Sequence, residues 1–183
     1  MGCRLQASIT KENCLYAVAG VKALYLFNYD SANAYEFDDE GALESITLSG
    51  NSAAYKIDFA DASASWSDEL TANSNGSKYR KHTVSFTLNE YSYQVLNQGD
   101  ALSLGKFTAV VVDKAGQAVM LGRNNGLSAT SFNYASGAAD ADASGWTTVL
   151  SGAETEIGKR LTGESVIASL VNTGQAAPET EEA

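Results

Sequence analysis

Apolar and polar positions along this chain follow the short periods of β-strands rather than the longer repeat of helices. Residues 20–29 and 105–113 are apolar at both odd and even positions, which is typical of strands that are covered on both faces. The second segment continues through Lys114-Ala115-Gly116 into an apolar run at 117–122, so these two should form a hairpin. We therefore expect buried strands here, with 20–29 central in its sheet.

Other segments alternate between apolar and polar residues, which predicts strands with one face toward the core and one toward water. In residues 78–88, for example, Val84 and Phe86 alternate with Thr83 and Ser85. The remaining predicted strands are 34–37 and 43–49, joined by a turn at 38–41, then 54–70, 127–135 and 146–150, the last of which closes the sheet.

The longest predicted hairpin joins 54–70 to 78–88. Residues 71–77 between them are rich in Asn, Ser and Gly, which marks a turn. Both arms exceed the usual strand length of about 5–6 residues. We therefore expect the tip of this hairpin to project beyond the body of the domain.

One short helix is predicted at 90–98, with Asn89 as its N-cap and Gly99 at its end. With so many strand patterns, we expect one mainly β domain over residues 1–155. Residues 156–183 form a C-terminal arm with an acidic end, and we expect its last ten or so residues to be disordered.

Charge changes the choice of partners. The chain has 183 residues, with 12 basic and 22 acidic side chains and a formal net charge of -10. Such a surface repels phosphate backbones and anionic lipid, so we expect neither tight nucleic-acid binding nor a membrane partner. No apolar run approaches the roughly 20 residues of a membrane helix, and we expect a protein of the cytoplasm or of a particle assembled there. Cys3 and Cys14 are too few for a disulfide scaffold or a structural zinc site, and we expect reduced thiols.

No set of residues suited to catalysis is evident from the sequence. His82 is the single histidine, and its place on one strand face with Val84 and Phe86 favours a structural role at a sheet edge. Residues 140–145 copy the first half of an EF-hand calcium loop, but the twelfth position, which needs glutamate, is Ser151. We therefore predict no enzyme activity, no cofactor and no metal site.

Positive charge is concentrated at Lys78, Arg80, Lys81 and His82, beside the tip of the long hairpin. Two interpretations stay open. The cluster would bind an acidic surface of a second copy of the chain, or a phosphate, by charge complementarity. Alternatively, these charges only protect an edge strand against aggregation.

Four segments carry a further signal. They are GSKYRKHTVSFTL at 76–88, ALSLGKFTAVVVDK at 101–114, LGRNNGL at 121–127 and GWTTVLSGAE at 145–154. In these segments, and in order over about residues 15–160, the chain resembles virion structural proteins of bacteriophages that infect Bacteroidetes, of the tail-tube or neck-ring type.

The resemblance implies a tail-tube-like fold, which is a β-sandwich or partly closed barrel with one short flanking α-helix. It implies a homo-oligomer, with hexameric rings that stack into a conduit through which DNA passes without specific binding. Other phage tail or neck proteins would be partners, and the protein would belong to the virion, assembled in the host cytoplasm. The hairpin at 61–82 would contact the next subunit or ring, through Trp66, Asp68, Glu69, Lys78, Arg80 and Lys81.

A second hypothesis comes from a different class of protein. The chain would be a carbohydrate- or surface-binding β-sandwich of a virion decoration or fibre protein, monomeric or oligomeric. Trp66, Trp146 and exposed tyrosines would then serve as stacking platforms for sugar rings.

Overall fold

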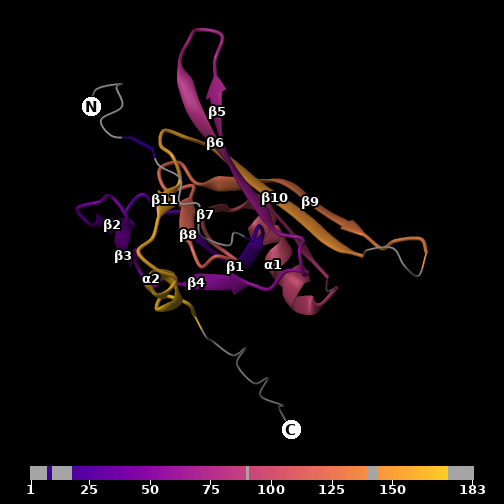
Figure 1. Ribbon diagram of the computed structural model, residues 1–183. Coiled ribbons are helices and arrows are strands. Elements are labelled where there is room, and N and C mark those ends of the chain that lie inside the picture. The colour runs from indigo at the N-terminus through magenta and orange to yellow at the C-terminus, as the bar shows by residue number, and fades with distance from the viewer. Residues whose placement is uncertain (1–7, 10–17, 90, 140–143, 173–183) are drawn as a thin grey trace.

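The computed structural model describes residues 8–9, 18–89, 91–139 and 144–172, and it is mainly β, as the sequence predicted (Figure 1). Its strands are β1 (Val21–Asn28), β2 (Ala34–Phe37), β3 (Leu43–Thr47), β4 (Ala54–Ile57), β5 (Ser65–Ala72), β6 (Lys78–Leu88), β7 (Lys106–Asp113), β8 (Ala118–Leu121), β9 (Leu127–Ala135), β10 (Gly145–Glu154) and β11 (Lys159–Arg160). Its helices are α1 (Tyr93–Leu104) and α2 (Ser165–Ala168).

Strand β7 connects the two halves of the main sheet. Along one edge it pairs with β1, which in turn pairs with β4. Along the other edge it pairs first with β9, through Lys106 and Phe107, and then with β8. From β9 the sheet continues through β10 and β6 to β5. The sheets are not closed into a barrel, and a sandwich-like class is consistent with the structure.

The first core cluster lies between the two halves of the sheet. Leu24 of β1 and Val111 of β7 pack in one cluster with Phe86 of β6 and Leu150 of β10. These side chains come from strands that are far apart in the sequence, so their burial holds the two halves together. Each fully buried side chain of this size stabilises the fold by about 1.5–3 kcal/mol relative to its exposed state.

The second core cluster covers the opposite face of β1 and β7. Phe27 and Val110 pack there with Leu43 of β3 and with Leu161 and Ile167 near the C-terminus. Strands β1 and β7 are therefore buried on both faces, as their apolar pattern predicted. The β2–β3 hairpin and α2 form the outer layer over this face.

The chain after residue 155, predicted as an arm, packs on the domain as far as Asn172. Leu161 and Ile167 are fully buried. The hydroxyl of Tyr25 donates a 2.8 Å hydrogen bond to Glu164, and burial together with this carboxylate raises the pKa of Tyr25 to about 12. Backbone hydrogen bonds join Ala54 to Leu170 and Asn172. The predicted disorder of the last residues lies outside the described part of the chain.

The predicted strand at 54–70 is wrong, because it is two strands in different halves of the sheet. β4 ends at Ile57 and pairs with β1, whereas β5 begins at Ser65 and pairs with β6. The turn between them places Ala62 at a φ of 57°, a conformation that alanine rarely adopts. Because the polar and apolar alternation continues through the turn, the pattern does not mark the break.

The predicted helix is also displaced. α1 begins after Ser92, whose hydroxyl accepts a hydrogen bond from the Val95 backbone N–H, and it runs through Gly99 to Leu104. Gly99 does not end the helix. It lies against Phe132, and a Cβ atom at this position would be 3.1 Å from the ring, so this glycine allows the helix to approach β9.

The last predicted strand, 146–150, does not close the sheet. The observed strand β10 runs over ten residues and lies between β9 and β6. A break in the pairing register between Val149 and Leu150 marks a bulge on the β9 side. The open end of this half of the sheet is instead β5, which follows β6.

Candidate functional site

The β5–β6 hairpin extends beyond the rest of the sheet (Figure 1). Its two strands pair from Ser65 opposite Ser85 to Ala72 opposite Lys78, but β10 accompanies β6 only as far as Arg80. A turn closed by a 2.8 Å backbone hydrogen bond from Asn73 to Ser77 forms the tip. In the described part of the chain, no strand pairs with the outer edge of β5. Its backbone groups there are open to another strand, apart from the Asp68 carbonyl, which accepts a 3.2 Å hydrogen bond from Arg80 Nη2.

The basic residues of the hairpin do not form one cluster. The pairing register places Lys78, Arg80 and His82 on the same face as Trp66 and the core-facing side chains, while Lys81 lies on the other face. His82 is buried. The positive surface at the tip therefore comes from lysine and arginine alone, and it is divided between two faces.

Asp68 and Arg80 form an ion pair within the subunit. The Arg80 Nε atom donates a 2.6 Å hydrogen bond to Asp68 Oδ1, and the Gly158 N–H donates to Asp68 Oδ2 at 2.9 Å. Burial alone would raise the pKa of Asp68, but the hydrogen bonds from Arg80 and Gly158 outweigh it and lower the pKa below its usual value. These two predicted contact residues hold the hairpin to the 155–160 segment.

His82 lies in the interior of the sheet, between β5 and β10, rather than at the predicted sheet edge. Its Nδ1 atom accepts a 3.2 Å hydrogen bond from the Gly122 N–H, and its Nε2 atom is 3.4 Å from Asp68 Oδ1. The ring therefore connects the hairpin to the end of β8. These contacts describe a structural histidine that orients the base of the hairpin.

The other predicted contact residues lie at the surface. Glu69, Lys78 and Lys81 are exposed, and Trp66 is 38% exposed. Sequence reasoning missed Leu70, which is 58% exposed beside the tip. The sequence pattern that could have identified Leu70 is an apolar residue in a strand expected to extend beyond the core. An unpaired strand edge, an exposed leucine and unshared lysine charge can bind a protein surface, but they offer no arrangement for bond-breaking chemistry.

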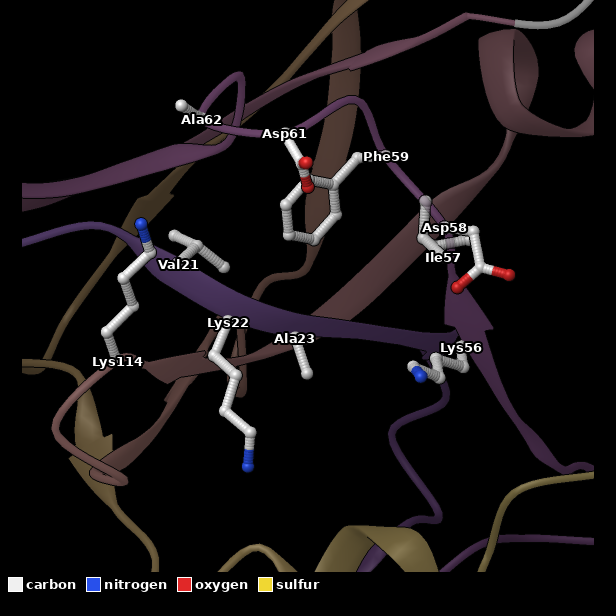
Figure 2. Close-up of a pocket in the computed structure, with 10 residues that line it drawn as sticks. All are labelled: Val21, Lys22, Ala23, Lys56, Ile57, Asp58, Phe59, Asp61, Ala62 and Lys114. Carbon is white, nitrogen blue, oxygen red and sulfur yellow. The ribbon is translucent and has the colours of Figure 1, made fainter.

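A groove beside β1 and β4 is lined by three lysines and two aspartates among its residues. Figure 2 shows that the ammonium groups of Lys22, Lys56 and Lys114 point in different directions. Lys22 instead forms a 3.1 Å ion pair with Glu164. The lysines therefore do not converge on one point where an anion would bind.

An aromatic cluster lies where β9 and β10 meet the start of α1. Trp146 stacks on Phe132, with ring centroids 4.5 Å apart, and Tyr91 lies nearly parallel to it at 6.0 Å. Trp146 is thus enclosed by rings rather than presented as an open platform. The exposed members are Tyr91 and Tyr134, whose side chains are 63% and 41% exposed.

The half calcium motif falls largely outside the described residues, and so do Cys3 and Cys14. Among the described residues, no group of His, Cys, Asp and Glu side chains is arranged to hold a metal ion. Within that same part of the chain, no helix is both long and apolar enough to cross a membrane. Comparison with known proteins finds no family model and no curated protein that matches this chain.

Proposed function

We propose that this chain is a bacteriophage virion structural protein of the tail-tube or neck-ring type, which assembles with copies of itself into stacked rings around a conduit for DNA. The observation that carries the proposal is the β5–β6 hairpin, which projects from the body with the outer edge of β5 unpaired. A long exposed edge is an aggregation hazard in a monomer. Assembly in which each copy covers the edge of the next removes that hazard.

The charge of the chain suits a conduit for DNA. A net charge of -10 makes the average surface repulsive toward phosphate. A repulsive wall keeps DNA from adhering and so lowers resistance to its passage. The assembly we propose is a hexameric ring, stacked on further rings and on other tail or neck proteins of the virion.

Negative-stain electron microscopy of the purified protein at high concentration tests this proposal directly. We expect rings or tubes. The matched control replaces residues 72–78 by Asn-Gly, which leaves the hydrogen-bonded pair Thr71 and Tyr79 joined by a two-residue turn suited to a hairpin. This variant keeps the Asp68–Arg80 pair and should fold, but it should not form rings. Wild-type protein that stays monomeric, together with its absence from purified virions by mass spectrometry, would sink the proposal.

The aromatic cluster supports a second candidate function, a carbohydrate-binding β-sandwich on a virion surface. Tyr91 and Tyr134 lie 4.9 Å apart in a T-shaped contact and are both exposed, and tyrosine rings of this kind stack on sugars. The test is binding of the protein to a glycan array, with Tyr91→Ala as the comparison. Glycan binding by a strictly monomeric protein, lost in the variant, would favour this function over ring assembly.

A further inference from the structure

The tip of the β5–β6 hairpin carries positive charge without a nearby acid in its own turn. From residue 70 to residue 81 the chain has three basic side chains and no aspartate or glutamate. Arg80 is paired with Asp68, which leaves Lys78 and Lys81 as exposed cations. Only Glu69, directly across from Lys81 in the strand pairing, lies close to them in the hairpin.

The β2–β3 hairpin carries the opposite charge. Residues 34–44 contain five carboxylates and no lysine or arginine, and the carboxylates are Glu36, Asp38, Asp39, Glu40 and Glu44. All except the half-buried Asp38 are exposed. The Asp38 carboxylate accepts the backbone N–H groups of Glu40 and Ala42, at 3.0 and 2.8 Å, and so shapes the turn.

Two basic side chains approach this acidic hairpin from elsewhere in the chain, but they share a carboxylate of their own. Arg123 and Lys159 lie over the ring of Phe37, at 5.3 and 5.9 Å from its centroid. Both form ion pairs with Glu156. Their two charges are thus partly offset locally, and the surface of the β2–β3 hairpin stays strongly negative.

The two hairpins extend from different sides of the molecule (Figure 1). A single copy therefore does not bring its own basic tip to its own acidic hairpin. Each hairpin also has an open edge, because in the described part of the chain β5 pairs only with β6 and β2 pairs only with β3. Two different surfaces that are complementary in charge, both with free strand edges, favour a contact between copies.

We propose that the basic β5–β6 tip of one copy docks on the acidic β2–β3 hairpin of the next copy. Lys78 and Lys81, on opposite faces of the tip, lie on either side of the acidic turn and face the carboxylates of Asp39 and Glu40, and the exposed Leu70 supplies apolar area on the Lys78 face. The contact is head-to-tail, because it joins two different surfaces. Such a contact repeats from copy to copy and closes into a ring or continues as a filament. This inference rests on the proposed function and names the acceptor surface within it.

Charge reversal on each side of the contact tests it. The tip variant is Lys78→Glu/Lys81→Glu, and the acceptor variant is Asp39→Lys/Glu40→Lys. Because like charges then meet, we expect each variant alone to need at least about tenfold more protein for half-assembly than the wild type. The matched control, Lys56→Glu/Lys114→Glu, changes the net charge as much as the tip variant at two exposed lysines away from both hairpins, and it should assemble like the wild type.

Complementation separates a lost contact from a lost fold. In a 1:1 mixture, the acidic tip of one variant meets the basic acceptor of the other, and the reverse pairing also matches. The mixture should therefore assemble, as should the chain that carries all four substitutions. Assembly is followed by sedimentation and electron microscopy, and far-ultraviolet circular dichroism checks that each variant is folded.

The outcomes distinguish this contact from the function on which it rests. Wild-type protein that never assembles overturns the contact, and if it is also absent from purified virions, the proposed function is overturned as well. Wild-type assembly that neither variant weakens, or variants that stay monomeric when mixed although folded, overturn the contact alone. Binding of labelled duplex DNA that depends on Lys78 and Lys81, with assembly unchanged in the tip variant, would assign the tip to phosphate instead.

Discussion

Strands β1 and β7 and the β5–β6 hairpin show two opposite uses of a β-strand in one molecule. β1 and β7 have partners along both edges and apolar cover on both faces. The hairpin has an open edge and leaves the core toward its tip. The first region therefore provides stability, whereas the second has little to lose from substitution and keeps backbone groups available for binding. Substitutions in the two regions should separate folding from assembly.

Phe27→Ala should have the largest effect. Phe27 is fully buried in the cluster between β1 and the β2–β3 layer, so its loss leaves a cavity and should destabilise the protein by about 3–5 kcal/mol. Trp66→Ala removes a larger side chain from the hairpin, but it should cost only about 1 kcal/mol because the ring is partly solvated. Urea unfolding measures both. Equal costs would remove the distinction between the regions.

Ile167→Ala should follow. Ile167 lies in the segment predicted as an arm, yet it is fully buried against the second core cluster. Truncation of such a side chain costs about 2–5 kcal/mol. The matched control is Ile157→Ala at an exposed isoleucine of the same segment, which should change the free energy of unfolding by less than about 0.5 kcal/mol. A similar small effect at Ile167 would show that the segment is not part of the core in solution.

Asp68→Asn should have an intermediate effect, at the border between the two regions. Loss of the carboxylate leaves Arg80 without its ionic partner and should cost about 1–3 kcal/mol at pH 7. The pKa of Asp68 is lowered in the folded state. The stability that the Asp68 carboxylate gives the folded state is therefore complete above the unfolded pKa of about 3.9. It is lost as the pH falls through the lower pKa of the folded state.

The pH dependence provides the check on this pair. Urea unfolding from pH 7 to pH 3 should show that the wild type loses stability toward acid more steeply than Asp68→Asn. Asp58→Asn, at another aspartate for which no partner role is proposed, serves as the control and should follow the wild type. Parallel curves for Asp68→Asn and the wild type would mean that the ion pair does not stabilise the base of the hairpin.

Leu70→Ser should have the smallest effect on folding. The side chain is 58% exposed, so the free energy of unfolding should change by less than about 0.5 kcal/mol. Assembly, by contrast, should require more protein, because the substitution removes apolar area beside the tip. Sedimentation compares the two chains. A loss of stability without any change in assembly would show that Leu70 stabilises the fold and does not take part in assembly.

Much of the strand layout could be predicted because its signals are local. β6 and β9 have the bounds that the sequence predicted, since turn residues such as Gly76 and Gly126 directly precede their alternating patterns. The break between β4 and β5 was missed because its left-handed residue is Ala62, which carries no turn signal. The end of α1 was missed because Gly99 does not end the helix. Its lack of a side chain instead allows close contact with Phe132.

The candidate site was predictable in part for the same reason. The exposure of Lys78 and Lys81 could be predicted because their strand extends beyond the core. The turn at 73–77 could be predicted from its own residues. The hydrogen bonds from Arg80 and Gly158 to the Asp68 carboxylate could not be predicted, because these residues lie 12 and 90 positions from Asp68 in the sequence. A charged residue looks the same in the sequence whether its partner lies within the chain or on another copy.

The sequence by itself determined the β character of this protein, the turns between most strands, and the strongly negative charge. Each of these depends on near neighbours or on composition alone. The tertiary structure decided that β7 joins three other strands, that β1 is covered on both sides by particular partners, and that the 156–172 segment completes a core. Those outcomes depend on which distant apolar faces pack together, and many strands with the same alternation are interchangeable until packing selects among them.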